Sequence, residues 1–383
     1  VIIMAHTASH DIIIIGRNIA GLGAAYALGK AGYSSLIIGP ETRLYGGFQL
    51  APNGFSALEA LGLRQNIDAG ALAVNAIQLK SLERAETLAE ISHDDTLPYA
   101  GISRQHILDC LLAAVKNLPV TMMDSHLKAL DLGRGSAQNR LLLETGDIIS
   151  APLLVGADGP AGLCRSAITG YQPEQAASDY LAMRAEIPAS TLAKSFSNPV
   201  CQLWLGSGSH FVCYPFTHQG QSLVNAVYCM KRSALSSGAS EAIQQTFSRH
   251  PVLSSFADNN IVWQETDLPD CESLPVWQRG GLTLIGDAAH QMPPHLAQGA
   301  GQVFEDIACL SECLTQAPPE QALRDMARIR SHDVTAIMQK ARQSGSVMRL
   351  DGLSARMRNN FIKMAGGGFV EDWLRSVWYG PKR

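Results

Sequence analysis

A buried strand that runs into a glycine turn and then into a helix limits the folds open to this chain. The segment IIIIGRNIAGLGAAYALGKAG (12–32) has four isoleucines, glycines at the turn, and small or apolar residues at helical spacing. A second apolar segment, SSLIIG (34–39), follows directly. This order of strand, turn, helix and strand predicts a βαβ unit of the kind that binds dinucleotides.

The turn has the form G-x-N-x-x-G in place of the usual G-x-G-x-x-G. Gly16 permits the tight exit from the strand, and Gly21 lets the helix approach it closely. Backbone N–H groups at the start of the helix, at Ile19 and Ala20, favour a pyrophosphate. Asn18 tolerates unusual backbone angles, but its Cβ narrows the approach to the phosphate. We expect a working nucleotide cradle that binds loosely; the alternative is a purely structural βαβ unit.

The end of the second strand departs from the usual pattern too. An acidic residue normally stands there and holds the ribose hydroxyls. Here the strand ends in Gly39 and Pro40, and Glu41 follows. We expect Glu41 to substitute for the missing acid, with Arg43 close to it in the same site.

Two later segments repeat the pattern of an apolar strand followed by glycine and aspartate. They are LLVGADGPAGLCR (153–165) and LTLIGDAAHQMPPHLAQGAGQVFEDIACL (282–310). An aspartate at the carboxyl end of a parallel strand lies in the crevice where α/β sheets bind ligands. We therefore expect Asp287 to accept a hydrogen bond from a hydroxyl group of a bound nucleotide. The helix that begins near Gly299 offers N–H groups and a partial positive charge to an anionic ligand.

The remainder of the chain predicts an α/β fold with an α+β insertion. Strand-like segments replace helical periodicity between about 172 and 272, which indicates a mostly antiparallel sheet inserted as a second domain. Helices are expected at 53–62, at 102–118 after a Ser103 cap, at 299–315 and at 319–345. In the tail, Trp373, Trp378 and Tyr379 are expected to dock on the body of the protein. The expected domains are a nucleotide-binding domain (1–71, 100–171 and 273–340), a substrate domain (72–99 and 172–272) and a helical tail (341–383).

Composition excludes several classes of protein. The formal net charge of −4 gives no electrostatic footprint for nucleic acid, and no apolar run is long enough to span a membrane. The first residues lack the pattern of a secretory signal, and the eight cysteines are scattered, which favours reduced thiols in the cytoplasm. Cys309 and Cys313 lie four apart, but no histidine cluster completes a zinc site, so we expect no metal.

Taken together, these segments resemble the FAD-dependent aromatic hydroxylases, the single-component (group A) flavoprotein monooxygenases. The chain is most similar to the branch of salicylate hydroxylase, 6-hydroxynicotinate 3-monooxygenase and 3-hydroxybenzoate 6-hydroxylase. The motifs that carry the resemblance are GRNIAGLGAAYALGKAG, GGFQLAPNGFSALEALGL, ISRQHILDCLLAAV, GADGPAGLCR, HFVCYPF and GDAAHQMPPHLAQGAGQVFED.

The resemblance implies a p-hydroxybenzoate hydroxylase-like fold, with a Rossmann-like FAD-binding domain and an inserted substrate sheet. It implies an enzyme that uses FAD, O2 and NADH or NADPH to hydroxylate a small phenolic or N-heteroaromatic substrate through a flavin C4a-hydroperoxide. The family has no separate NAD(P)H domain, so the reduced nicotinamide would bind transiently. We expect a monomer or a homodimer.

The family's motifs place a set of residues on the FAD. They are Gly16, Asn18, Ile19, Ala20, Gly21, Glu41, Arg43, Arg104, Asp158, Gly159, Arg165, Asp287, Pro293, Gly299 and Ala300. The sequence departs from the family pattern at Asn18 and Gly39, at Gly301, where the family often has Asn, and at Ala297, where it often has Gly. We therefore expect FAD to bind, but less tightly than usual.

The segment HFVCYP places His210 and Tyr214 on one face of a strand. In the family branch, an H-x-x-x-Y-P motif lies in the substrate pocket, where the histidine helps to deprotonate the phenol. A histidine suits general-base work near neutral pH, and Tyr214 would orient the substrate. The alternatives are an ordinary sheet histidine and a tyrosine that only packs in the core.

Two further residues, Gln49 and His295, are predicted substrate contacts by the same resemblance. No arginine occurs in 196–230, so we expect a substrate that is neutral or merely phenolic. Two other functions stay open. One is a flavin-dependent hydroxylase, epoxidase or reductase of a larger apolar substrate, such as a quinone precursor or polyene, which a larger and more apolar pocket would favour. The other is a degenerate homologue with weak FAD binding.

Overall fold

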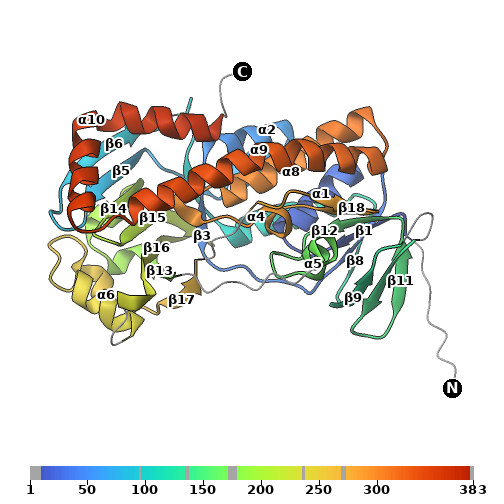
Figure 1. The fold of residues 1–383 in the computed structure, drawn as a ribbon, viewed down its shortest axis with the longest axis horizontal. Coiled ribbons are helices and arrows are strands. Elements are labelled where there is room, and N and C mark those ends of the chain that lie inside the picture. The colour runs from blue at the N-terminus through green and yellow to red at the C-terminus, as the bar shows by residue number, and fades with distance from the viewer. Residues whose placement is uncertain are drawn as a thin grey trace.

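The computed structural model describes residues 10–94, 96–133, 138–170, 179–234, 238–268 and 273–379. Two large sheets lie at opposite ends of an elongated molecule, and long helices run across one side of both (Figure 1). Residues 1–9, on which the expectation about a secretory signal rests, and Cys271 lie outside the described residues. No helix in the described part of the chain is both long and apolar enough to cross a membrane.

The first sheet is the predicted nucleotide-binding sheet, with strand order β18-β19-β12-β1-β2-β8. Each face of β1 is buried in a different apolar cluster, because helices cover both sides of this parallel sheet. The expected βαβ unit, in which α1 joins β1 to β2, is confirmed. The strands are β1 (Ile12–Ile15), β2 (Ser35–Ile38), β8 (Val120–Met123), β12 (Leu153–Gly156), β19 (Leu282–Leu284) and the antiparallel edge strand β18 (Gln278–Arg279).

The helices of this half are close to the predicted ones. The helix expected at 102–118 begins at Arg104, because residues 100–103 pair as a strand with 47–50. Ser103 caps it as predicted, since its hydroxyl accepts a hydrogen bond from the backbone N–H of His106. The helices are α1 (Ile19–Lys30), α2 (Pro52–Ala60), α3 (Arg64–Asp68), α4 (Arg104–Val115), α5 (Leu163–Thr169), α7 (Asp287–His290), α8 (Gly299–Gln316) and α9 (Pro319–Met348).

Two small sheets complete this half of the molecule. A hairpin that turns at Thr145, Gly146 and Asp147 forms an antiparallel pair of strands and leads directly into β12. It belongs to a sheet of β9 (Leu127–Asp131), β10 (Asn139–Leu143) and β11 (Ile148–Ala151). The other small sheet, which leads into the cavity described below, contains β3 (Gly47–Leu50), β7 (Ala100–Ser103) and β4 (Ala71–Ala73).

The second large sheet is the predicted, mostly antiparallel insertion, with order β17-β13-β16-β15-β14-β5-β6. Only β14 and β5 pair in parallel. One face packs against α6 (Ala239–Phe247), a helix that we did not predict, with Phe211 and Phe247 in the shared core. The strands are β5 (Ala76–Ser81), β6 (Thr87–Ser92), β13 (Tyr180–Pro188), β14 (Val200–Leu205), β15 (His210–His218), β16 (Gln221–Lys231) and β17 (Gln264–Asp267). Short 3-10 helices are η1 (Ala189–Thr191), η2 (Lys194–Phe196), η3 (Arg232–Ala234), η4 (Ser254–Ala257) and η5 (Pro294–Leu296).

The tail forms one long helix, α10 (Gly352–Trp378), which is kinked at Gly366, where φ is 76°. It lies over β5 and β6 at one end of the molecule (Figure 1). Trp373 and Trp378 pack into the apolar cluster there, as expected. The expectation was wrong for Tyr379, which is 52% exposed because it follows the last turn of the helix. The domain boundaries stay a prediction.

Candidate active site

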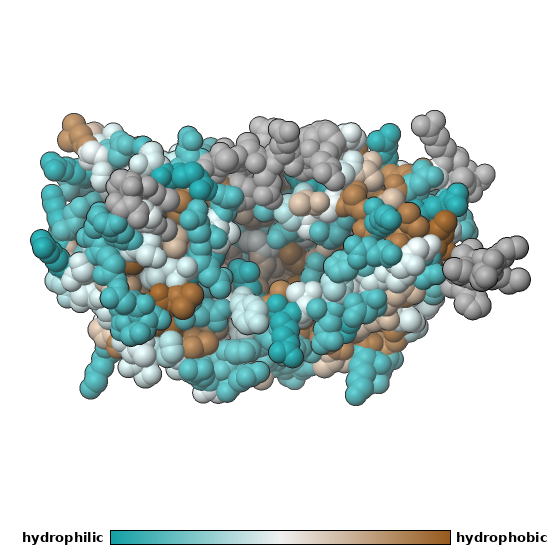
Figure 2. Space-filling view, turned by 90° about the horizontal axis from the view of Figure 1, so that it is seen from below, coloured by the Kyte–Doolittle hydropathy of each residue, from teal (hydrophilic) through white to brown (hydrophobic). Residues whose placement is uncertain are grey.

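A cavity of about 1250 Å³ lies between the two large sheets. It is lined by the start of α1, by β3, by one face of the inserted sheet, by η5 and the start of α8, and by α9 and α10. Figure 2 shows a face of the molecule that is hollowed near its middle. The cavity therefore joins the predicted nucleotide turn to the predicted substrate residues.

The glycine turn is built as tightly as its sequence predicts. The φ of Gly16 is +119°, and a Cβ there would lie 2.3 Å from the carbonyl oxygen of Ala157. A Cβ at Gly21 would lie 1.9 Å from the carbonyl oxygen of Gly16. Both glycines lie behind the cavity surface, which is formed by Asn18, Ile19 and Ala20. The two glycines allow the close packing of the backbone, and Asn18, Ile19 and Ala20, which lie between them, face the cavity.

The side chain of Asn18 already occupies the helix start. Its Oδ1 accepts hydrogen bonds from the backbone N–H groups of Ala20 and Gly21, both at 3.1 Å. Its Nδ2 donates to the carbonyl oxygen of Ala157 at 2.6 Å. Of the two N–H groups that we expected to meet a pyrophosphate, that of Ala20 is therefore already satisfied by the chain itself, together with that of Gly21.

Glu41 and Arg43 line a second cavity, of about 360 Å³, together with Arg17. Leu44 lines both cavities, so the two adjoin. A Cβ at Gly39 would lie 2.6 Å from the backbone nitrogen of Arg17, which explains why glycine stands where an acidic residue was expected. The structure therefore brings Glu41 and Arg43 together, as expected, in a cavity next to the larger one.

Arg104 lines the larger cavity from the start of α4. Its Nε is buried and has no hydrogen-bond partner among the described residues. Its guanidinium carbon lies 5.9 Å from the ring centre of Phe48. A buried donor with no partner is costly, so this site fits an anionic or carbonyl group of a cofactor.

Of the motif residues Asp158, Gly159 and Arg165, only Gly159 lines the cavity, and the other two stabilise the backbone around it. Asp158 accepts a hydrogen bond from the backbone N–H of Cys164 at 3.0 Å, and burial raises its pKa. Gly159 lines the cavity, whereas Arg165 is buried behind it. Arg165 donates to the carbonyl oxygen of Ala288 at 3.0 Å. The structure thus places Asp158 and Arg165 as supports of neighbouring turns.

Asp287, Gly299 and Ala300 line the cavity at the starts of α7 and α8, as the sequence predicts. Pro293 does not line it, although the next residue, Pro294, does. The first turns of α1 and α8 therefore approach the same space. This arrangement supplies a carboxylate for hydroxyl groups and helix N–H groups for a negatively charged ring edge.

A buried ionic network, missed in the sequence, holds the Asp287 turn. Asp306 accepts hydrogen bonds from the backbone N–H of Gly286 at 3.1 Å, from His290 Nε2 at 2.6 Å and from Arg330 Nε at 2.8 Å. Burial alone would raise the pKa of Asp306, but His290 and Arg330 together hold it below its usual value. The sequence did contain a signal for this network. Asp306 and Arg330 occupy positions on the apolar faces of two amphipathic helices, α8 and α9, where a charged residue needs a partner.

The inserted sheet presents His210 and Tyr214 to the cavity from the same face of β15, as predicted. His295, from η5, meets His210 with the two ring centres 5.2 Å apart. Burial lowers the pKa of His210 well below its usual value and lowers that of His295 to about 4. The Nδ1 atoms of both rings are buried and have no partner among the described residues. Both rings line the cavity, and burial favours their neutral form at physiological pH.

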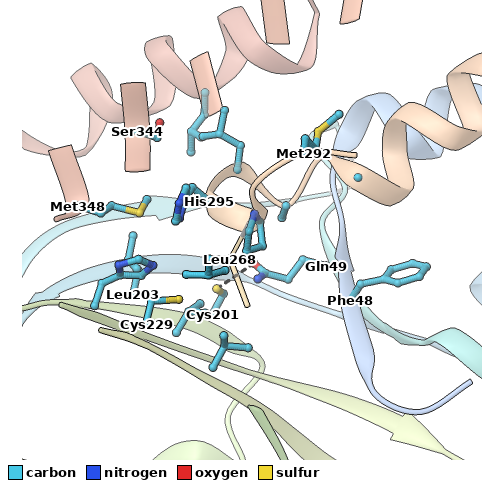
Figure 3. Close-up of a pocket in the computed structure, with 18 of the residues that line it drawn as sticks. Phe48, Gln49, Cys201, Leu203, Cys229, Leu268, Met292, His295, Ser344 and Met348 are labelled. Carbon is cyan, nitrogen blue, oxygen red and sulfur yellow. Dashed lines mark hydrogen bonds between the residues drawn. The ribbon is translucent and has the colours of Figure 1, made fainter. Parts of the chain in front are cut away.

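Tyr214 and Gln49 are held by neighbouring groups. The hydroxyl of Tyr214 donates to the carbonyl oxygen of Gly47 at 3.0 Å. Gln49 Oε1 accepts from the hydroxyl of Tyr99 at 2.7 Å and from the Cys201 thiol at 3.1 Å (Figure 3). The Gln49 oxygen is thus occupied, and its Nε2 makes no hydrogen bond to a described residue. Tyr214 therefore contributes its ring to the wall of the cavity, while Gln49 can donate a hydrogen bond from its Nε2 to a ligand.

Most of the remaining wall is apolar. It comprises Ile77, Leu79, Leu203, Leu205, Val212, Val227, Leu268, Met348, Ile362, Val370, Trp373, Leu374 and Trp378. Figure 3 shows Leu203, Cys201 and Cys229 below His295, on the side of the sheet. Arg184, which sequence reasoning missed, interrupts this wall from β13. No group of three or more histidine, cysteine or acidic residues within the described ranges could hold a metal ion.

Comparison with known proteins identifies the family. A family described as "FAD binding domain" matches residues 9–343. The chain belongs to this FAD-binding family. It is 28% identical to 3-hydroxybenzoate 6-hydroxylase 1 of Aquipseudomonas alcaligenes, over 97% of this chain and 98% of that protein. It is 24% identical to 6-hydroxynicotinate 3-monooxygenase of Bordetella bronchiseptica, over 80% of this chain and 82% of that protein.

The fold is that of a solved structure as well. The chain superposes on Klebsiella pneumoniae HpxO, solved with FAD and uric acid, with a TM-score of 0.81, 17% identity and 98% of each chain covered. The family, the fold and the FAD cofactor predicted from the sequence are confirmed, and the chain is a flavin-dependent monooxygenase. The unpartnered Nε of Arg104 and the close-packed glycines of the turn fit FAD.

Proposed function

We propose that the chain hydroxylates a small phenolic or N-heteroaromatic substrate, with FAD, O2 and NADH or NADPH. The relatives named above carry hydroxybenzoate and hydroxynicotinate in their names, which supports this substrate class. The observation that carries the proposal is the pair of neutral histidines, His210 and His295, in the cavity that reaches the starts of α1 and α8. Bound FAD supplies the activated oxygen, and the residues of the chain prepare the substrate.

His210 is the residue that receives the substrate hydroxyl. Because burial disfavours the imidazolium form, the ring is an acceptor that polarises the phenol O–H and makes the aromatic ring more electron-rich. Gln49 Nε2, from β3, donates to the same substrate. The apolar wall excludes water, which protects reactive oxygen chemistry from hydrolysis and strengthens these polar contacts.

The test is oxidation of NADH and NADPH by FAD-loaded protein with a panel of phenols and hydroxypyridines. Stimulated oxidation together with a product that gains one oxygen atom supports the proposal. His210→Asn is expected to lower product formation by about 10²- to 10⁴-fold. His332→Gln is the matched control, because the side chain of His332 is 88% exposed. Nicotinamide oxidation that yields only hydrogen peroxide with every compound contradicts the proposal.

A second candidate function is hydroxylation of an aromatic that carries an apolar extension. The cavity continues beneath α10, where Ile362, Trp373 and Leu374 line it. A volume of about 1250 Å³ exceeds the usual range of small-molecule pockets, about 300–1000 Å³, although FAD takes part of it. A series of 4-alkylphenols distinguishes the candidates, because affinity rises with chain length only if the space beneath α10 is used.

We infer in addition that the protein works in the cytoplasm. The seven cysteines of the described residues are free, and four of them are buried, which suits a reducing compartment.

For the oligomeric state of the protein, a monomer and a homodimer both stay open. Light scattering of the FAD-loaded protein measures the state directly.

A further inference from the structure

An apolar stripe is exposed along the first half of α10. Seven of the twelve large apolar side chains that are exposed in the described part of the chain fall within 347–369, so they form one patch and are not scattered over the surface. Four of them repeat at helical spacing and therefore share one face of α10. This apolar stripe consists of Leu353, Met357, Phe361 and Met364, each between 49% and 81% exposed.

The kink of α10 joins the stripe to a further aromatic ring. The two halves of the helix run in different directions, and the turn between them lies at one end of the molecule (Figure 1). Phe369, beyond the kink, meets Phe361 with the two ring centres 5.4 Å apart. The kink lies directly on the inserted sheet, because a Cβ at Gly367 would lie 2.0 Å from the carbonyl oxygen of Glu90 in β6. The backbone therefore fixes where the stripe lies.

The stripe borders an opening of the cavity. Met357, Phe361 and Phe369 line the cavity and are also exposed, so the cavity meets the solvent at this end. An opening here admits water to a site whose wall is mostly apolar, whereas reactive oxygen chemistry needs water to be excluded. A single chain therefore leaves this end of the candidate active site incomplete.

The exposed area is that of a protein interface. Together the seven side chains present roughly 600–800 Å² of surface, at about 150–200 Å² for each fully exposed large side chain. A monomeric protein rarely exposes an apolar patch larger than a few hundred Å². Each partner in a stable interface of standard size contributes about 800 Å². The patch is therefore large enough for a stable dimer.

The charges beside the stripe favour a second copy of the chain over a membrane surface. A helix that lies on an anionic membrane carries several free cations along its apolar face. Between 352 and 370, Arg358 is buried and donates to three backbone carbonyl oxygens, and Lys363 is paired with Glu86. Only Arg356 has no partner within the described residues. A two-fold axis, in contrast, brings two identical apolar faces together and needs no free cation.

We propose that a second copy of this chain docks on the apolar stripe with its own stripe and closes the opening of each cavity. In a two-fold pair the two helices run antiparallel, so the start of one stripe lies over the end of the other. Each copy then covers Met357, Phe361 and Phe369 of the other, and the candidate active site is complete only in the dimer. The inference goes beyond the proposed function, because it concerns assembly and not the reaction.

The first test is the mass of the FAD-loaded protein by light scattering at micromolar concentration. Twice the mass of one chain is expected. The double variant Leu353→Glu, Met364→Glu should dissociate at least about 100-fold more readily, because it brings unpaired like charges together in the interface. Neither residue lines the cavity, so the cavity wall is unchanged. Val262→Glu is the matched control and should stay dimeric, because Val262 is 78% exposed, follows η4 and does not line the cavity.

The second test is quenching of tryptophan fluorescence by acrylamide. Trp373 and Trp378 line the cavity, whereas Trp204 and Trp277 are buried away from it. Quenching should be stronger in the monomeric double variant than in the natural protein and in Val262→Glu. Thermal melting of each variant shows that it is folded. Neither test uses a substrate, so failure of the proposed function is recognised separately.

Four results would overturn the inference. The natural protein could be monomeric, or the double variant could stay dimeric, in which case another face forms the dimer. The double variant could become monomeric with unchanged quenching, which would show that the partner does not close the cavity. The natural protein could also sediment as a monomer with vesicles of phosphatidylcholine and phosphatidylglycerol, and a membrane surface would then be what covers the stripe.

Discussion

The side chain of Asn18 accepts a hydrogen bond from the backbone N–H of Gly21 at 3.1 Å, within the turn that should receive the FAD pyrophosphate. The N–H of Ala20 donates to the same oxygen. A glycine at this position would leave both donors free. The turn is thus closed by its own side chain, and we propose that FAD binds there by displacing that side chain.

Asn18→Gly should therefore tighten FAD binding. Displacing one capping side chain costs about 1 kcal/mol, so the dissociation constant should fall about fivefold. The protein without FAD should lose only a few tenths of a kcal/mol, because glycine is itself an acceptable cap. Quenching of FAD fluorescence during titration measures the affinity. Asn18→Ala is the control, since it removes the cap but keeps a Cβ close to the phosphate. Equal affinity of the natural protein and Asn18→Gly would show that the turn already fits.

Replacing Gly39 by the expected acid should not improve FAD binding. A Cβ at Gly39 would lie 2.6 Å from the backbone nitrogen of Arg17, so Gly39→Asp forces the backbone apart. Such overpacking costs typically about 1–3 kcal/mol, which urea unfolding measures. Glu41→Gln should instead weaken FAD severalfold if Glu41 holds the ribose. Tighter FAD binding by Gly39→Asp would refute this interpretation.

The base function of His210 should persist at low pH. Burial lowers its pKa well below the usual value of about 6.5, so the ring stays neutral and able to accept a proton as the pH falls through 6.5. Between pH 6 and 8, kcat/KM should show no inflection that belongs to this residue. The pH profiles of the natural protein and His210→Asn should therefore run parallel. An inflection near pH 6.5 that disappears in the variant would mean that His210 is an ordinary, solvated histidine.

His295 should make the folded protein sensitive to mild acid. Its pKa is lowered to about 4 by burial and then by Arg349, against about 6.5 in the unfolded chain. The unfolded state therefore binds more protons between these values, so stability is full above pH 6.5 and falls as the pH drops toward 4. The loss from this group is up to about 3 kcal/mol. Urea unfolding at several pH values measures this loss. The free energy of unfolding should fall less steeply with decreasing pH in His295→Gln than in the natural protein, and equal dependence on pH would contradict the prediction.

Asp306→Asn should destabilise the fold and loosen the cofactor turn. The substitution leaves His290 and Arg330 without their shared charge in a buried site. Breaking such a pair costs about 3–5 kcal/mol, and the lower end applies because Glu305 still pairs with Arg330. FAD affinity should fall too, since the turn that carries Asp287 is released. Asp325→Asn, which breaks a surface pair with Arg328, should change stability by less than about 1 kcal/mol. Equal effects of the two variants would mean that the buried network is not structural.

Local sequence patterns predicted the nucleotide-binding sheet because its strands are apolar runs that end in glycines. The close contacts of Gly16 and Gly21 follow from the same pattern. The helix α6 was missed because it is short and lies within a region of strand periodicity. The kink of α10 follows from one glycine, Gly366, among three in a row, and the sequence alone does not single it out.

The candidate site was predictable in part. The pattern of HFVCYP placed His210 and Tyr214 on one face, but their surroundings depend on η5 and β3, which are distant in sequence. The direction of the Asn18 side chain and the partner of Arg165 are tertiary facts with no local signal. Arg184 escaped notice because an arginine in an alternating strand normally faces solvent, and only the position of the cavity shows otherwise.

The measurement that tests the central claim most directly is an absorbance spectrum of the protein after it is mixed with FAD and desalted. The account predicts retained flavin bands near about 370 and 450 nm, which belong to the oxidised cofactor. It predicts a larger retained fraction for Asn18→Gly than for the natural protein. A natural protein and a variant that both emerge colourless would contradict the account, because the cavity between α1 and α8 would then not be a flavin site.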